Sequence, residues 1–442
     1  MHGTTGGADK GGELHFQVGQ LTRVEGEGSL DLHVAADGSI DAKLRIFEAP
    51  RYFERLVVGR TPDEVLDIVA RICGICPVAY QMSAVHAFES LFEVPIDPAV
   101  RSLRRLMYCG EWIESHALHI FLLHAPDFLG YPSAVEMASD HLELVSRGLR
   151  IKKLGNRIIS IIGGRAIHPV SVRVGGFSRA PRAREMDELR APLEAGILDA
   201  EETVKWVASL DTPASDREPR MVDLRHPSEY PMNDGRIVSS DGIDLAPGDW
   251  GRAFHEEQVA WSHALQSRAA DGIPYLLGPT ARVALAGDQL HPTARAALDA
   301  TGISPQALQR NVFRSIVARS VELLHALADA SDIVAAYRPP ERPATQWKAR
   351  PGTAAWATEA PRGLLFHRYR VDAAGHVRTA QIVPPTSQNQ AAIEHDLALF
   401  APAVLHMPHE EATRRLEQLI RSYDPCISCA THFLQLRIDQ DR

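Results

Sequence analysis

The sequence predicts an α+β fold that is mainly helical, with a central bundle of long helices and small peripheral β-hairpins or sheets. Helical spacing of apolar residues recurs in long segments, and two short stretches alternate in the manner of hairpin strands. No internal repeat or evident linker divides the 442 residues. A chain of this length can bury a large core, so we expect a single domain over residues 13–432.

The first elements follow from turn and capping signals. Apolar and polar residues alternate over 30–46 on both sides of an Asp-Gly turn, which predicts a hairpin. Residues 61–64, Thr-Pro-Asp-Glu, form a capping box with proline at the first helical position. The helix that begins there leads to Cys73, and Pro77 can open the next helix. The first cysteine pair is therefore expected in a helix–helix corner.

The rest of the chain is predicted from the same signals. Helices are expected at about 98–124, 134–162, 184–210, 252–271, 304–336 and 409–422, a second hairpin at 363–383, and irregular structure at 211–251 and 337–362. Pro425 disfavours a helical conformation at Asp424, so the second cysteine pair is expected on a loop.

Composition excludes several classes of protein. The hydrophobic fraction of 45% and charged fraction of 23% fit a globular domain. A net charge of -9 and a pI of about 6.1 provide no basic field for nucleic acid. No apolar run is long enough to span a membrane. The Gly-rich start, residues 1–12, is expected to be a disordered tail and lacks the pattern of a signal peptide.

Cysteine usage is the most informative feature. Of five cysteines, four form two Cys-x-x-Cys pairs, Cys73 with Cys76 and Cys426 with Cys429, and only Cys109 is left over. An odd number of cysteines suits a reducing cytoplasm. Four soft thiolates from opposite ends of the chain predict a metal cage. Structural zinc sites usually keep their pairs close in sequence, and no βαβ pattern supports a redox dithiol, so both alternatives are weaker.

The flanking residues carry a resemblance. They are Leu-Thr-Arg-Val-Glu-Gly at 21–26, Pro-Arg-Tyr-Phe-Glu at 50–54, Glu-Ser-His-Ala-Leu-His at 114–119, Ala-Ile-His-Pro-Val-Ser-Val-Arg-Val-Gly-Gly-Phe at 166–177, Thr-Glu-Ala-Pro-Arg-Gly at 358–363 and Pro-Thr-Ser-Gln-Asn at 385–389. In this order, and bracketed by the two cysteine motifs, they resemble the large subunit of nickel–iron hydrogenases over residues 21–432. The chain is most similar to the cytoplasmic, NADP-linked bidirectional branch, the sulfhydrogenase alpha subunits.

This resemblance implies a catalytic centre for the reversible heterolytic cleavage of H2 into protons and electrons. Nickel would be held by Cys73, Cys76, Cys426 and Cys429. Cys76 and Cys429 would bridge to an iron that carries one CO and two cyanides. The Cys426 thiolate and Arg362 are the two candidates for the base that accepts the proton.

The resemblance also implies roles around the metals. Glu25 would relay the proton, Arg362 and Thr386 would each donate to a cyanide, and Asp424 would pair with Arg362. By residue type alone, Glu25 is a solvated loop glutamate and Asp424 a turn aspartate before proline.

Glu54 and His432 match ligands of a second, hard-cation site, which would hold magnesium or, because imidazole is less typical for magnesium, iron. A lone histidine such as His432 can also be simply exposed. Tyr80 and Ser115 depart from many relatives, which carry His and Asp at these positions.

Missing ligands imply partners. A four-cysteine iron–sulfur cluster needs thiolates that this chain does not have to spare, and no Gly-x-Gly-x-x-Gly follows a predicted strand. Electrons would therefore pass to an iron–sulfur small subunit. The resemblance to the NADP-linked branch implies that they then reach flavin- and NAD(P)-binding diaphorase subunits. Residues 433–442 would be an extension that a maturation endopeptidase removes. The alternatives are a structural-zinc interaction protein and a non-catalytic relative of the complex I type, although that relative has lost the cysteines.

Overall fold

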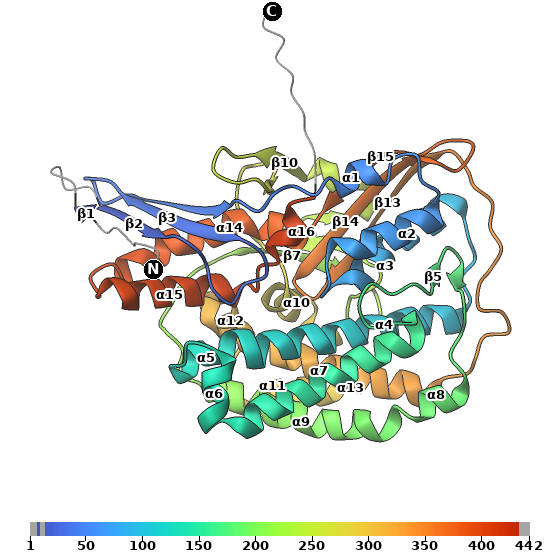
Figure 1. The fold of residues 1–442 in the computed structure, drawn as a ribbon, viewed down its shortest axis with the longest axis horizontal. Coiled ribbons are helices and arrows are strands. Elements are labelled where there is room, and N and C mark those ends of the chain that lie inside the picture. Colours follow the sequence, from blue (N-terminus) through green and yellow to red (C-terminus); the bar gives the residue numbers. More distant parts are fainter. Residues whose placement is uncertain (1–6, 9–13, 433–442) are drawn as a thin grey trace, which may run out of the picture.

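The computed structural model describes residues 7–8 and 14–432. Four long helices form a bundle (Figure 1): α4 (Pro98–Ala117), α7 (Leu142–Gly163), α9 (Arg190–Ala208) and α13 (Ser315–Ala336). Helix α4 packs against α7 and α13, and α9 packs against α7 and α13. Small sheets and most of the remaining helices lie above this bundle in Figure 1. The predicted α+β, mainly helical fold is confirmed.

The other elements are short. The helices are α1 (Phe53–Leu56), α2 (Pro62–Val69), α3 (Pro77–Phe92), α5 (Ala125–Leu129), α6 (Ala134–Asp140), α8 (Ala183–Asp187), α10 (Pro279–Ala286), α11 (Pro292–Ala300), α12 (Pro305–Arg310), α14 (Pro385–Phe400), α15 (His409–Ser422) and α16 (Ile427–Ala430). A π-helical segment, η2 (Leu118–His124), continues α4, and 3₁₀ turns are η1 (Ala70–Ile72), η3 (Pro247–Arg252), η4 (Gly287–Gln289), η5 (Val312–Arg314) and η6 (Ala401–Ala403).

Five small sheets complete the described part of the chain. Their strands are β1 (Gly7–Ala8), β2 (Leu14–Val18), β3 (Gly28–Val34), β4 (Ile40–Ile46), β5 (Val172–Arg173), β6 (Gly176–Phe177), β7 (Arg220–Arg225), β8 (Arg236–Ser239), β9 (Asp244–Leu245), β10 (Phe254–Gln258), β11 (Leu265–Ala269), β12 (Tyr275–Leu276), β13 (Gly352–Ala360), β14 (Gly363–Val371) and β15 (Val377–Val383). The strand orders are β1-β2-β3-β4, β5-β6, β12-β7-β8-β9, β10-β11 and β13-β14-β15.

Both predicted hairpins and the early helix signals are confirmed. Strands β3 and β4 pair antiparallel, as do β14 and β15. The backbone N–H of Thr61 donates to the Glu64 carboxylate at 2.8 Å, which satisfies one unpaired donor at the start of α2. The Asp97 carboxylate accepts from the Ala99 N–H at 2.7 Å and so caps α4. These local signals fix where the elements that carry the first cysteine pair begin.

The helix predicted over 252–271 is wrong, because this segment forms the antiparallel hairpin β10–β11. The side chain of Gln266 on β11 is fully buried and donates to Glu394 of α14 at 2.9 Å. Helix α14 packs directly on β11. The contacts of this strand with another element therefore override the local helical preference.

Two further predictions need correction. The irregular segment predicted over 337–362 includes strand β13, whose Ala-rich sequence has low strand propensity but pairs along β14 and packs on α3. Helix α14 was not predicted, because its buried face includes Thr386, Ser387, Gln388 and Asn389 instead of an apolar stripe. Pairing and packing partners, which lie far away in the sequence, decide both elements.

Three predicted helices are interrupted. The segment 304–336 divides at Asn311, whose extended backbone and side chain cap the next turn through the Phe313 N–H at 2.9 Å. The segment 134–162 divides at His141, and 184–210 divides near Glu188. The second cysteine pair is not wholly on a loop, since Cys429 lies within the short helix α16.

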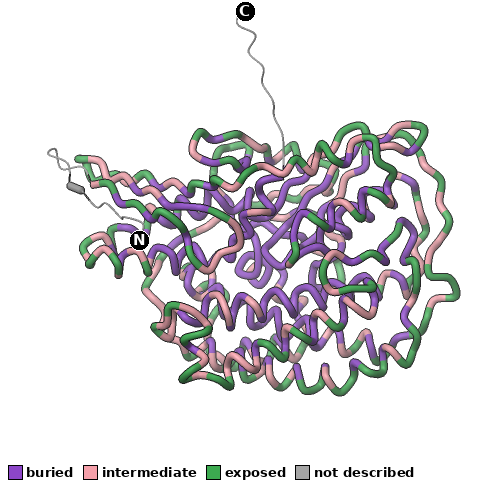
Figure 2. Tube along the Cα trace, in the orientation of Figure 1, coloured by how far each residue is buried: buried purple, intermediate pink, exposed green. Residues whose placement is uncertain are grey.

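Buried residues gather in the middle of the molecule, between the bundle of long helices and the sheets (Figure 2). All four cysteines of the two pairs belong to the main hydrophobic core. Of the predicted tail 1–12, only Gly7 and Ala8 are described, and they form β1 beside β2. The predicted extension 433–442 lies outside the described residues. Across the part of the chain that the structure describes, no helix combines the length and apolar character needed to cross a membrane.

Candidate metal centre

The fold brings together the two cysteine pairs from opposite ends of the chain. Cys73 follows the turn η1, and Cys76 directly precedes α3. Cys426 directly precedes α16, in which Cys429 lies. Both pairs therefore lie where short helical segments begin or end.

The four sulfur atoms form one compact group. Their Sγ atoms all lie within 4.8 Å of one another, and each residue is at most 4% exposed. The distance is 3.5 Å from Cys73 Sγ to Cys426 Sγ and 3.6 Å from Cys76 Sγ to Cys429 Sγ. Four thiolates buried together repel one another and lack solvation, and burial raises the pKa of the Cys429 thiol. A bound soft cation would offset the free-energy cost of burying the four thiolates, because it stabilises their deprotonated form.

A small cavity adjoins the sulfurs and is lined by Cys76, Tyr80, Ala360, Arg362, Pro385, Thr386, Cys426 and Cys429. The Tyr80 hydroxyl is buried and has no hydrogen-bond partner among the described residues. A buried unpaired hydroxyl is costly, so a ligand with acceptor atoms fits this cavity. The site thus fits a metal that carries additional small ligands.

Arg362 covers the cavity. Its Nε donates to the Asp424 carbonyl oxygen at 2.8 Å, Nη2 donates to the Asp424 carboxylate at 3.1 Å, and Nη1 lies 3.5 Å from Ser115 Oγ. Burial opposes its charge, but Asp424 and the nearby cysteine sulfurs hold the pKa of Arg362 well above its usual value. The sequence prediction that Arg362 and Asp424 form a pair is therefore matched by the geometry.

Asp424 has a strained backbone, with φ of 53°, in the left-handed region that side chains rarely adopt. This turn directs its carbonyl and its carboxylate to the same guanidinium. Burial raises the pKa of the Asp424 carboxyl, against the opposing effect of Arg362. The strain lies beside the thiol group, as is common at functional sites.

Glu25 reaches the same centre from the N-terminal part of the chain. Its Oε2 lies 3.0 Å from Cys426 Sγ and accepts from the Ser428 N–H at 3.1 Å. The Glu25 carbonyl accepts from the Ile427 N–H at 2.8 Å, and Glu25 forms an isolated parallel bridge with Cys426. Thr386 is also present, because its Oγ1 accepts from the Cys426 N–H at 2.9 Å. The Thr386 hydroxyl proton is therefore available to another acceptor.

Glu54 and His432 meet at a second place, just beyond the end of α16. His432 Nε2 lies 4.0 Å from Glu54 Oε1 and 2.5 Å from the Ile382 carbonyl oxygen. His432 is buried and Glu54 is partly buried, and desolvation raises the pKa of Glu54 to about 8 and lowers the pKa of His432 to about 4. A carboxylate, an imidazole and a carbonyl oxygen thus converge on one point.

One residue that supports the site was missed. Glu111 on α4 is fully buried and accepts from the Val78 N–H at 2.6 Å and the Ala79 N–H at 3.1 Å. It therefore caps α3, the helix that begins after Cys76. The sequence indicated only that α3 needs a hydrogen-bond acceptor from elsewhere, since Cys76 is a poor N-cap, and nothing in it pointed to Glu111.

The fold and this site define a metalloenzyme subunit built around a buried four-thiolate centre. Residues 51–147 and 254–432 match the nickel-dependent hydrogenase family. The chain is 34% identical over 424 residues to the alpha subunit of sulfhydrogenase 2 of Pyrococcus furiosus, covering 95% of this chain and 100% of that protein. It is 26% identical over 470 residues to the beta subunit of the NAD-reducing hydrogenase HoxS of Cupriavidus necator, covering 94% of each chain.

A solved structure shows the same fold. The crystal structure of an NAD+-reducing [NiFe]-hydrogenase in the H2-reduced state superposes with a TM-score of 0.87 and 27% identity, covering 95% of this chain and 99% of that one. The chain belongs to the nickel-dependent hydrogenase family. It is a catalytic large subunit, an oxidoreductase that acts on H2 at a nickel–iron centre. The predicted family and activity are confirmed.

Proposed function

We propose that Cys73, Cys76, Cys426 and Cys429 are the ligands of this centre, with Cys76 and Cys429 shared between nickel and an iron that carries CO and cyanide. The observation that carries the proposal is the group of four buried sulfurs within 4.8 Å of one another. Thiolates suit nickel that changes oxidation state. When bound, the centre supplies the heterolytic cleavage of H2.

The residues around the cavity have matching tasks. The Arg362 guanidinium keeps a positive charge beside the thiolates and can donate to one cyanide. The free proton of the Thr386 hydroxyl can be donated to the other. Asp424 fixes the orientation of Arg362 through two contacts, one from its carbonyl and one from its carboxylate.

The direct test is infrared spectroscopy, with nickel and iron analysis, on the complex purified anaerobically from its native host. Absorption bands of CO and cyanide together with bound nickel are the expected result. Zinc without nickel, and no such bands, in a chain trimmed after His432 would contradict the proposal and favour the structural-zinc alternative. The same purification identifies the partner subunits.

Glu25 is proposed as the group that takes the proton from the Cys426 sulfur. The distance of 3.0 Å between Glu25 Oε2 and Cys426 Sγ is within the range for direct proton transfer. Replacing Glu25 with Gln is expected to slow H2 oxidation by about 10²-fold or more, because general acid–base steps contribute about 10²–10⁴-fold. Nickel content should not change. A variant with unaltered turnover and an unaltered solvent isotope effect would assign the proton to another route.

Glu54 and His432 are proposed to bind a second cation, magnesium or iron. Each ring nitrogen of His432 lies 2.5 Å from a carbonyl oxygen, Nδ1 from Cys429 and Nε2 from Ile382. A neutral imidazole has only one N–H, so a cation at Nε2 would leave Nδ1–H to donate to Cys429. A divalent cation would also keep the buried Glu54 ionised.

Replacing Glu54 with Gln is expected to remove this second metal and to leave nickel in place. Metal analysis of the purified complex before and after the substitution checks the result. Glu394, which is buried and has a pKa raised by burial but does not contact Glu54 or His432, provides the matched control Glu394→Gln. Equal metal content in Glu54→Gln and the unchanged enzyme would show that no cation is held there.

The proposed partners are an iron–sulfur small subunit and flavin- and NAD(P)-binding subunits. The proposal is supported by the relatives, which include the alpha subunit of a sulfhydrogenase and a subunit of an NAD-reducing hydrogenase. It is also supported by the shortage of thiolates, since Cys109 is the one cysteine outside the group of four. The five cysteines are all buried and unpaired by disulfides, which suits the reducing cytoplasm.

A further inference from the structure

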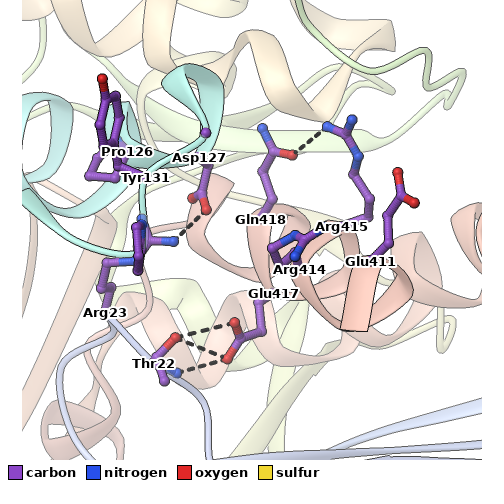
Figure 3. Close-up of a pocket in the computed structure, with 12 residues that line it drawn as sticks. Thr22, Arg23, Pro126, Asp127, Tyr131, Glu411, Arg414, Arg415, Glu417 and Gln418 are labelled. Carbon is purple, nitrogen blue, oxygen red and sulfur yellow. Dashed lines mark hydrogen bonds and ion pairs between the residues drawn. The ribbon is translucent and has the colours of Figure 1, made fainter. Parts of the chain in front are cut away.

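A pocket of about 690 Å³ opens between the loop that leads to Glu25, helix α5 with the turn that follows it, and helix α15. Its lining includes Thr22, Arg23, Asp127, Glu417 and Gln418 (Figure 3). Figure 3 shows the contact between Arg23 and Asp127 and the hydrogen bonds between Thr22 and Glu417. These buried charged contacts take no part in the chemistry described above.

Asp127 binds two arginines from opposite ends of the chain. Its carboxylate accepts from Arg421 Nε at 2.7 Å and from Arg421 Nη2 at 2.8 Å, a bidentate pair. It also accepts from Arg23 Nη2 at 2.5 Å. The side chains of Arg421 and Asp127 are only 1% and 5% exposed, so water screens this pair weakly.

The same group holds the N-terminal loop. Arg421 Nη1 donates to the Thr22 carbonyl oxygen at 2.9 Å, and the Glu417 carboxylate accepts from the Thr22 N–H at 2.9 Å. Arg23 Nη1 donates to the Leu123 carbonyl oxygen at 2.7 Å. The backbone of Arg23 has φ of 55°, a left-handed conformation that needs its neighbours to hold it.

Thr22 and Arg23 come just before Glu25, and Arg421 comes just before Cys426. We infer that Asp127, acting through Arg421 and Arg23, is a positioning residue that sets the 3.0 Å distance between Glu25 Oε2 and Cys426 Sγ. This inference rests on the proposed role of Glu25. In that step a proton leaves the Cys426 sulfur and is bound by Glu25 Oε2, and no electron moves.

The reason is geometric. The donor and the acceptor of the proton lie on segments that are remote in sequence, and proton transfer requires a heavy-atom distance of about 2.6–3.2 Å. The bridge between Glu25 and Cys426 aligns the two segments locally. Asp127 adds a fixed point outside that bridge, because it binds Arg421 on the Cys426 side and Arg23 on the Glu25 side at the same time.

The test is Asp127→Asn in the assembled complex. Asparagine keeps the shape but loses the charge and one acceptor, so it cannot bind both guanidinium groups as the carboxylate does. We expect H2 oxidation to slow by about tenfold to 10²-fold, because small misplacement of reacting groups has effects of that order. The solvent deuterium isotope effect should rise, while nickel content and infrared bands stay unchanged.

Glu411→Gln is the matched control, since Glu411 lines the same pocket and its side chain has no hydrogen bond or ion pair with the other residues drawn in Figure 3. It should leave rate and isotope effect unaltered. If Asp127→Asn does not assemble, Arg421→Lys decides the question in the same measurements, because lysine keeps the charge but not the bidentate fork.

Two results would overturn the inference. One is a rate and an isotope effect equal to those of the unchanged enzyme. The other is a slow variant whose nickel is lost or whose isotope effect is unaltered, which would indicate a merely structural role. Glu25→Gln separates the two proposals: if it is slow and Asp127→Asn is not, only the positioning role fails. If Glu25→Gln is itself unimpaired, the relay fails and the positioning role with it.

Discussion

Replacing Cys429 with serine is expected to abolish H2 oxidation and to reduce nickel in the purified complex to background. The Cys429 Sγ lies 3.0 Å from Cys426 Sγ and 3.6 Å from Cys76 Sγ, so it belongs to the centre of the group. A serine hydroxyl is a hard donor that stays protonated near neutral pH, whereas a thiolate is soft and easily formed. Loss of one of four ligands therefore removes both the charge and the donor type that the metals need.

The matched control for this substitution is Cys109→Ser. Cys109 is also fully buried, but its Sγ lies 3.7 Å from the Asp329 carboxylate and outside the group of four. Nickel content and activity should both be retained. Metal analysis and a hydrogen-uptake assay with an artificial dye on the same preparations measure the two effects. A Cys429→Ser enzyme that still holds nickel and oxidises H2 would show that the metals are held elsewhere.

Replacing Arg362 with lysine is expected to lower H2 oxidation by about 10²–10³-fold, the size of the effect when one preorganised donor is removed from an active site. Lysine keeps the charge, but a single ammonium cannot reproduce the planar fork that contacts both Asp424 and Ser115. Nickel should remain bound, because none of the four thiolates is changed. Turnover of the assembled complex, with nickel content on the same sample, measures the effect.

Arg368→Lys is the control, on strand β14, which begins directly after Arg362. Arg368 is partly exposed, and its Nη2 lies 3.4 Å from the Gly248 carbonyl oxygen near the surface. The Arg368→Lys enzyme should be fully active. Undiminished turnover in Arg362→Lys would mean that charge alone suffices over the cavity. Loss of nickel in that variant would instead give Arg362 a role in holding the centre together.

Local sequence signals predicted where several helices near the site begin. The capping box at Thr61 and Glu64 begins the helix before Cys73, and the Asp97 cap begins α4. Such signals act within a few residues and are visible in the sequence. The hairpin β10–β11 and strand β13 were not predicted, since their partners α14 and β14 are separate elements whose packing is invisible to local patterns.

The residues of the candidate site were likewise predicted only in part. The cysteine pairs and their flanks identified the family from residues alone, and they predicted Glu25, Arg362 and Asp424 as neighbours of the centre. The capping of α3 by Glu111 and the pairing of Asp127 with Arg421 were not predicted, because each joins positions on different elements. A side chain that stabilises a remote helix end has no periodicity of its own to reveal it.

The sequence by itself determined that two pairs of soft thiolates would share one metal centre, since residue type sets the chemistry of a ligand. It also predicted partners that carry the electrons, because the chain has too few cysteines for an iron–sulfur cluster of its own. Only the tertiary structure decided how closely Glu25 approaches Cys426 and that Asp127 pairs with Arg421, which is near Cys426 in the sequence. Distances between remote segments depend on how the whole core packs, and no local pattern encodes them.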